Sequence, residues 1–211
     1  MGRILGFMYM RSASLIVIVV VVAALSGAPV DAQPSARTAL PTVRANKIDG
    51  ETSKDFGGCS FACASSWKTR VSASIPPKGA LRYDASRLSD LDGSTAWASK
   101  GKGEWLEVVF EGKKDVASWT APLRGFRVVN GYAKSPAAWR ANSRVRSMRL
   151  DYNGRPRCRV TLLDTPDVQS VTFPEIAVHA GDRLRLTIDE VYPGASSPDT
   201  CISEIIFDGA H

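Results

Sequence analysis

Apolar and polar residues alternate in short stretches along most of this sequence, from Trp67 to Phe207. Alternation with a period of two residues is typical of β-strands that bury one face. It predicts strands over residues 67–74, 104–110, 123–129, 148–152, 158–162, 168–173, 182–188 and 202–207. Apart from an N-terminal apolar run, no segment longer than about ten residues repeats its apolar side chains at the period of a helix. About eight short strands separated by turns predict an all-β protein, an antiparallel sandwich or barrel.

A polar and aromatic loop separates two of the predicted strands, from Asn130 to Arg146. The strand after this loop leads into Asn153-Gly154, two residues that tolerate positive φ and therefore predict a tight hairpin. A rigid β framework that presents a loop rich in hydrogen-bonding groups and rings is the usual arrangement of a binding site.

The first 32 residues have the pattern of a secretory signal peptide. An apolar run over residues 15–25 follows two arginines, and small residues precede a plausible cleavage site before Gln33. The run is too short for a membrane anchor, which needs about 20 apolar residues. We therefore expect signal peptide 1–32, flexible linker 33–57 and a β domain over 58–211. The mature protein would be a secreted monomer without a transmembrane segment.

The chain is basic, with a formal net charge of +6 at pH 7. Much of this charge lies on predicted strand faces, at Arg149, Arg157, Arg159, Arg183 and Arg185. A solvated outer face explains such residues, and the alternative is an anionic partner such as an acidic polysaccharide or a lipid surface. Nothing resembles a recognition helix, so we expect no nucleic-acid partner.

Four cysteines in an exported chain predict two disulfides, and the sequence leaves three connectivities open. We favour Cys59–Cys63, which closes a short local loop, and Cys158–Cys201, which would join the hairpin to the last strand. A zinc site is the weaker interpretation, because the two histidines, His179 and His211, lack ligand spacing.

Several motifs, in this order and spacing, resemble one known family. They are LDGSTAW at 91–97, GEW at 103–105, NGY at 130–132, VYPG at 191–194 and DTCISEI at 199–205. Together they resemble the discoidin-like (coagulation factor V/VIII type C) module known as the NADase-type glycan-binding domain, over about residues 63–207. The resemblance implies a jelly-roll β-sandwich of the galactose-binding-like fold and a non-catalytic role in binding glycans or polysaccharides. The sequence departs from the family pattern in the basic segment 98–102, and at Trp139, where tyrosine is commoner.

Six residues are candidates for contact with a sugar: Tyr132, Lys134, Trp139, Asn142, Arg144 and Tyr192. A ring of Tyr132 or Trp139 could stack on the apolar face of a pyranose, or could instead close the end of the sandwich. Asn142 could donate to a sugar oxygen or cap the backbone of its own loop. Arg144 could reach a ligand or an acidic partner inside the protein.

Asp92, Thr95 and Glu204 form a second group of candidates. In discoidin-like carbohydrate-binding modules the equivalent loop often wraps a calcium ion, so the resemblance implies a possible structural Ca²⁺ site. In the metal-free alternative, Asp92 caps a turn and Glu204 pairs with an arginine. No nucleophile and base have catalytic spacing, so we expect no enzyme and no other cofactor. The alternatives to a glycan-binding module are an adhesion or protein-interaction module, and an electrostatic binder of anionic envelope polymers.

Overall fold

The computed structural model describes residues 39–52, 56, 61–63, 65–114, 116 and 118–209. The predicted signal peptide, Cys59 and His211 lie outside the described residues. Within them, no helix has both the length and the apolar character needed to cross a membrane.

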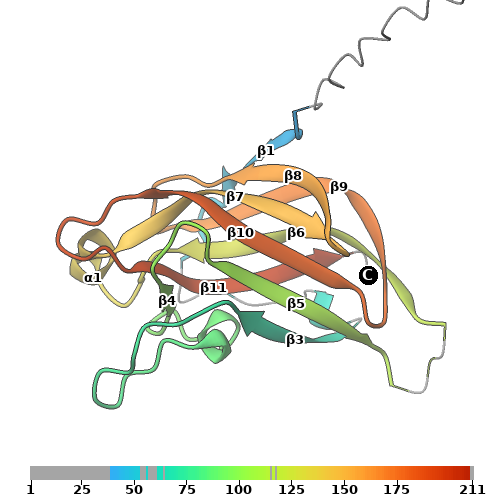
Figure 1. The fold of residues 1–211 in the computed structure, drawn as a ribbon, viewed down its shortest axis with the longest axis horizontal. Helices are drawn as coiled ribbons and strands as arrows, with labels where there is room; N and C mark the ends of the chain where they lie inside the picture. Colours follow the sequence, from blue (N-terminus) through green and yellow to red (C-terminus); the bar gives the residue numbers. More distant parts are fainter. Residues whose placement is uncertain are drawn as a thin grey trace, which may run out of the picture. The chain divides into compact units, whose positions relative to one another are not determined.

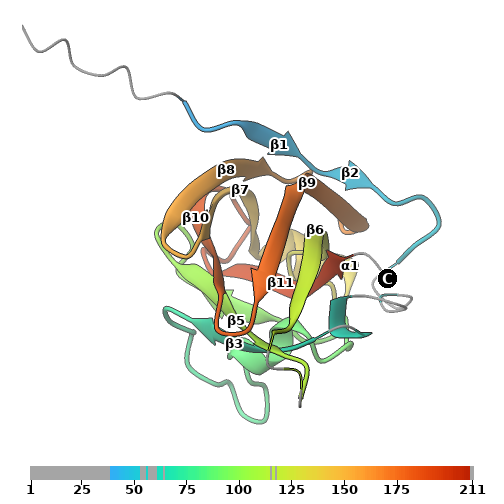
Figure 2. The ribbon, with the colours of Figure 1, turned by 90° about the vertical axis from the view of Figure 1, so that its right-hand side faces the viewer.

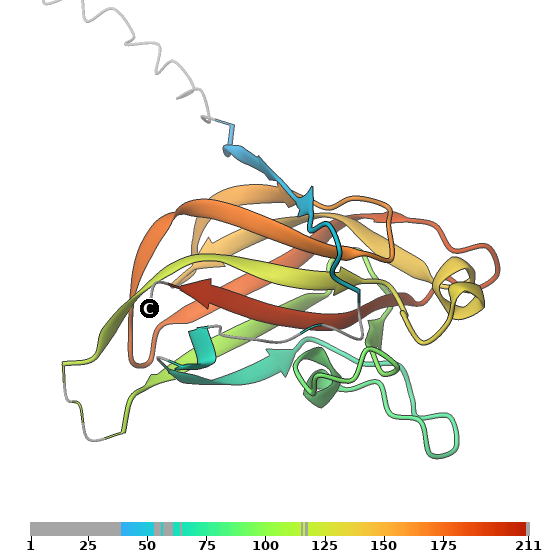
Figure 3. The same cartoon turned by 180° about the vertical axis from the view of Figure 1, so that it is seen from behind.

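The long strands form two layers of a β-sandwich, one seen from the front in Figure 1 and the other from the front in Figure 3. The first layer has the order β3 (Ser66–Val71), β5 (Trp105–Gly112), β10 (Arg183–Tyr192), β7 (Ser143–Tyr152) and β8 (Arg155–Thr161). The second layer has the order β9 (Val168–His179), β6 (Thr120–Asn130) and β11 (Thr200–Gly209). Neighbours within each layer are antiparallel.

These eight strands confirm the predicted jelly-roll β-sandwich. The described part of the chain has 11 strands, and the additional three are short: β1 (Thr42–Arg44), β2 (Asn46–Lys47) and β4 (Trp97–Ser99). Three helical segments complete it: η1 (Phe61–Cys63), η2 (Ala85–Leu88) and α1 (Pro136–Ala141). The predicted hairpin at Asn153-Gly154 is also confirmed, with φ of 50° and 76° at the two turn residues.

The core lies between the layers and follows the predicted alternation. In β10, for example, Leu184, Leu186 and Ile188 are buried between the layers while Arg183 and Arg185 point outward. Aromatic rings fill the centre of the core, where Phe207 contacts Phe110 and Phe126 edge-on. Each such side chain contributes about 1.5–3 kcal/mol by leaving water. Strand β11 is buried along nearly its whole length: β6 pairs with its C-terminal part, and β4 and β7 pair with its first residues.

The predicted linker 33–57 is wrong for the part that the structure describes. Strand β1 pairs in parallel with β8, and β2 pairs with β9, so this segment bridges the edges of the two layers (Figure 2). The side chains of Ala45 and Phe56 are buried against the sandwich. Strands of two or three residues are too short to show any periodicity, which explains why the sequence did not reveal them.

The predicted Cys158–Cys201 disulfide is wrong. Cys158 lies opposite Leu150 of β7, whereas Cys201 lies opposite Arg144 of the same strand. Six residues of a strand span about 20 Å, and a disulfide requires Cα atoms within about 7 Å. Both side chains are buried free thiols, and burial raises the pKa of Cys201 to about 12. The Cys59–Cys63 pairing stays a prediction, because Cys59 is not described.

Candidate ligand-binding site

The loop that the sequence singled out leaves β6 and folds into the short helix α1 at one end of the sandwich (Figure 1). The side chain of Ser135 caps the helix by accepting the Ala138 N–H, and Pro136 occupies the first helical turn. Asn142 ends the helix, where its side-chain amide donates to the Ala138 carbonyl at 2.9 Å. Of the two roles predicted for Asn142, the structure therefore shows the backbone cap.

Trp139 of α1 lies across the start of the loop. Its indole Nε1 donates to the Asn130 carbonyl at 2.8 Å, and the Arg144 guanidinium lies 4.4 Å from the ring centre. Gly131, at φ +94°, makes this close approach possible, since a Cβ there would lie 2.7 Å from the Trp139 ring and 2.6 Å from Arg144 Cγ. The ring is half-buried and held by these contacts.

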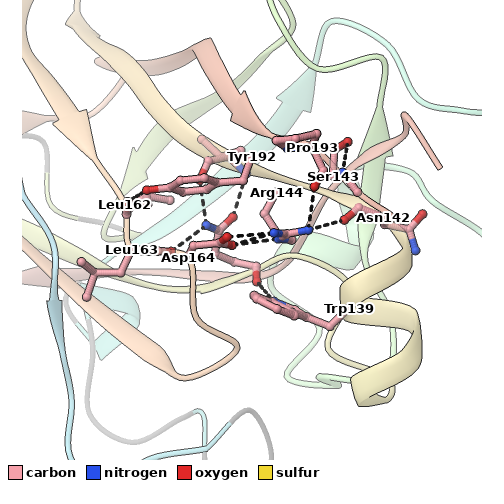
Figure 4. A network of polar contacts seen from close by, with 12 residues as sticks. Trp139, Asn142, Ser143, Arg144, Leu162, Leu163, Asp164, Tyr192 and Pro193 are labelled. Atoms are coloured by element: carbon pink, nitrogen blue, oxygen red, sulfur yellow. Dashed lines mark hydrogen bonds and ion pairs between the residues drawn. The ribbon is translucent and has the colours of Figure 1, made fainter. Parts of the chain in front are cut away.

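Arg144 joins three loops of the candidate site (Figure 4). Its Nε and Nη2 both donate to the Asp164 carboxylate at 2.9 Å, and its Nη1 donates to the carbonyls of Asn142 and Pro193 at 3.0 and 3.2 Å. The residue is only 7% exposed. A bidentate guanidinium–carboxylate pair fixes geometry as well as charge. Arg144 therefore positions the loops around it.

The other aromatic candidates also pack against the protein. Tyr132 is 9% exposed and meets the Tyr83 ring edge-on at 6.3 Å, and burial raises the pKa of its phenol. Tyr192 is half-buried, and its hydroxyl donates to the Leu162 carbonyl at 3.0 Å. Lys134 is exposed. The predicted residues thus gather at one end of the sandwich, where most of them form its framework.

A hollow of about 600 Å³ opens beside this framework. It is lined by Lys100, Lys102, Ser143, Val191 and residues 193–198. The Ser143 hydroxyl accepts the Gly194 N–H at 3.1 Å and donates to the Ser197 carbonyl at 3.3 Å, which holds the loop over residues 193–198 in place. We call this hollow the loop-end hollow. Its two lysines lie in the basic segment 98–102, which departs from the family pattern. That departure is the feature of the sequence that could have indicated these lysines as site residues.

The second group of candidates surrounds Glu204 in β11. Glu204 is fully buried, and neither carboxylate oxygen has a hydrogen bond of good geometry to the described residues. Burial, and then the neighbouring Asp90 carboxyl, raise the pKa of Glu204 to about 8. The backbone N–H groups of Leu91 and Asp92 act in the opposite direction. A buried carboxylate without a cation is costly, so this position favours a proton or a metal ion.

The carboxylate beside Glu204 belongs to Asp90, which the sequence analysis missed. The Asp92 carboxylate instead accepts from the backbone N–H and hydroxyl of Ser94, at 2.9 and 2.6 Å, as the metal-free interpretation expected. Thr95 donates its hydroxyl to Asp90 at 2.9 Å. Leu91, between the two aspartates, has a positive φ of 60°. The described residues contain no cluster of three or more His, Cys, Asp or Glu suited to a metal.

The comparisons with known proteins agree with this architecture. Residues 62–208 match the family model of the NAD glycohydrolase translocation F5/8 type C domain. The search of curated proteins found no match.

The search of solved structures found several similar chains. The CBM32-1, CBM32-2 and M60 catalytic domains of Clostridium perfringens ZmpB match with a TM-score of 0.50 and 11% identity, over 82% of this chain and 17% of that chain. CpGH89CBM32-5 from Clostridium perfringens, in complex with GalNAc-β-1,3-galactose, matches with a TM-score of 0.49 and 14% identity, over 67% of this chain and 94% of that chain. The CBM32 of AlyQ, in complex with 4,5-unsaturated mannuronic acid, matches with a TM-score of 0.45 and 13% identity, over 68% and 95%.

Proposed function

Because this chain belongs to the family of NAD glycohydrolase translocation F5/8 type C domains, we propose that it is a non-catalytic module that binds a glycan at the loop-end hollow. The observation that supports this proposal most directly is a preformed concavity beside a rigid loop framework. Protein sites for small ligands are concave and largely preformed, with a few polar groups that fix orientation.

The chemistry of the hollow suits a sugar. Lys102 is exposed, and a lysine ammonium can donate to several sugar oxygens. The hydroxyls and carbonyls of residues 193–198 add both donors and acceptors, which a ring bearing several hydroxyl groups requires. The Arg144–Asp164 pair keeps these groups in place before a ligand arrives, and this lowers the entropy lost on binding. Stacking of a sugar on Trp139 stays a prediction.

A glycan array at low and at physiological salt tests the proposal. It compares three proteins: the wild type, Lys102→Ala and Arg124→Ala. The wild type should bind a neutral glycan saturably at both salt concentrations. Lys102→Ala should weaken that binding about tenfold, the effect of losing a hydrogen bond from a charged donor. Arg124→Ala removes an exposed arginine of β6, distant from the hollow, and should change nothing.

Two results would contradict the proposal. Unchanged binding by Lys102→Ala would place the ligand elsewhere. An array without any bound glycan would favour the adhesion alternative, in which the same loops meet a protein partner.

We propose in addition that Asp90 and Glu204 hold a calcium ion. The supporting observation is the buried Glu204 carboxylate, which has no hydrogen bond of good geometry and lies beside a second carboxyl. Calcium prefers carboxylate and carbonyl oxygens, and the 90–95 loop can supply both. Asp90 already pairs with Arg87 at 3.1 Å, so the ion would chiefly neutralise Glu204 and would fix this loop on β11.

A further inference from the structure

A second hollow, far from the loops that line the loop-end hollow, lies on the outward face of the five-stranded layer. Its volume is about 610 Å³, and its walls include Glu107, Arg149, Asp151, Arg183 and Arg185 and the turn at residues 153–154. We call it the arginine groove. These residues come from β5, β7 and β10 and from the turn into β8, strands that lie side by side at the front of Figure 1.

The strand register explains why opposite charges alternate across the groove. Arg185 of β10 lies directly opposite Glu107 of β5 on one side and Asp151 of β7 on the other. Opposite charges at such cross-strand positions stabilise a sheet. The two carboxylates are only 5% and 6% exposed, because the arginine side chains cover them.

Two guanidinium groups of the groove are held in fixed orientations. Arg185 donates through Nε and Nη2 to Glu107 Oε2, at 3.1 and 2.8 Å, and stacks 4.2 Å from the Trp105 ring centre. Arg149 donates through Nε and Nη2 to the Asp151 carboxylate at 2.9 Å. Within the described residues, Nη1 of neither arginine donates a hydrogen bond, so both keep donors for a ligand.

Arg183 adds a cation without a partner among the described side chains. Its backbone N–H donates to the Asn153 side-chain carbonyl at 2.9 Å, so the hairpin turn fixes the position of its backbone. Its guanidinium is exposed at the edge of the groove. The groove therefore contains two oriented guanidinium groups and one exposed positive charge that has no partner among the described side chains.

We propose that the arginine groove binds the acidic sugar units of a uronic-acid polysaccharide. A guanidinium recognises a planar carboxylate through paired N–H groups. Asp151 and Glu107 lie beneath the arginines and hold two of the guanidinium groups in place for this pairing. Three arginines against two carboxylates give a small net positive charge, which matches a polymer with one carboxylate on each sugar. A densely charged chain such as polyphosphate or nucleic acid would instead bring more negative charge than the single excess positive charge of the groove can balance.

This site is separate from the loop-end hollow. The two hollows contact opposite ends of β10, at Arg183 and at Val191, eight residues apart. Eight residues of a strand span about 26 Å. A glycan chain could therefore occupy one site without filling the other.

Calorimetric titration of the protein with tetragalacturonic acid tests the proposal, with its methyl ester and tripolyphosphate as comparison ligands. We expect saturable binding of the acid, and binding at least about tenfold weaker for the methyl ester. Arg183→Gln should also weaken binding about tenfold. The Arg183 side chain forms no hydrogen bond or ion pair with the described residues, so this variant should fold normally. Arg124→Gln, an exposed arginine of the opposite layer, should bind like the wild type.

Amide chemical shifts should change on β5, β7 and β10 around the groove during the same titration. The proposal is overturned if the protein does not bind tetragalacturonic acid, or if Arg183→Gln and the wild type bind it equally. Tighter binding of tripolyphosphate with the same shift changes would also overturn it, because that result indicates general attraction of anions.

Discussion

Replacing Glu204 by glutamine should affect stability in opposite directions with and without calcium. Glu204 is fully buried, and burial together with the Asp90 carboxyl raises its pKa from the ordinary 4.5 to about 8. Without calcium the folded protein therefore retains a proton on Glu204 at neutral pH. Glutamine has nearly the same shape as the protonated side chain and carries no charge at any pH, so it removes the need for that proton.

The raised pKa sets the size of the effect. Between pH 4.5 and 8 the unfolded chain has lost this proton while the folded protein keeps it, so rising pH favours unfolding. The free energy of unfolding falls by about 1.4 kcal/mol for each pH unit in this range, which amounts to about 3 kcal/mol at pH 7. Glu204→Gln should therefore stabilise the calcium-free protein by up to about 3 kcal/mol at pH 7, or several degrees in Tm.

Calcium should reverse the order. It binds the ionised carboxylate, and an ion present at a hundred times its dissociation constant stabilises the folded state by about 2.7 kcal/mol. The variant lacks this carboxylate and should gain little. As the pH rises, wild type should thus lose stability in EDTA but not in saturating calcium. The variant should show this loss of stability in neither solution.

Urea unfolding between about pH 5 and pH 8, in EDTA and in calcium, measures both effects. Glu175→Gln is the control, because this exposed carboxylate in β9 forms only a surface pair with Arg124 and should change stability by less than about 1 kcal/mol. A variant less stable than wild type in EDTA at pH 7 would refute the reasoning, since Glu204 would then be ionised and stabilised by the protein. Equal stabilisation of both proteins by calcium would refute the calcium site.

Two further predictions follow from the packing. Gly131→Ala should destabilise the protein by about 1–3 kcal/mol in urea unfolding, because the added Cβ would overlap Trp139. Gly103→Ala is the matched control, because Gly103 has nearly the same φ (+88° against +94°) and a Cβ there would have no atom within 4 Å. An equal loss of stability in both variants would show that backbone strain alone causes the effect. The thiols of Cys158 and Cys201 should resist iodoacetamide at pH 8 in the folded protein and react after unfolding, as peptide mapping would show. If neither thiol reacts with iodoacetamide when the protein is unfolded without a reductant, the two cysteines are oxidised.

Only part of the candidate site could be predicted from the sequence. The sequence predicts a binding loop after Asn130, and the structure places the residues of this loop together at one end of the sandwich. Arg144 could not be assigned, because its partner Asp164 is 20 residues away in the sequence and reaches it only through the pairing of β7 with β8. Asp90 was missed because the family motif begins at the next residue, and the different hydrogen-bond partners of Asp90 and Asp92 appear only in the folded loop.

The sequence by itself determined the eight long strands and the class of fold. A period of two and the Asn153-Gly154 turn are local properties, and local geometry decides which face of a strand is buried. The tertiary structure decided everything that depends on which strands become neighbours. It placed Cys158 and Cys201 too far apart for a disulfide, and it aligned Arg185 between two carboxylates to form the arginine groove. The physical reason is that the pairing of strands and its register are set by the whole sandwich, whereas alternation along one strand reports only which face of that strand is buried.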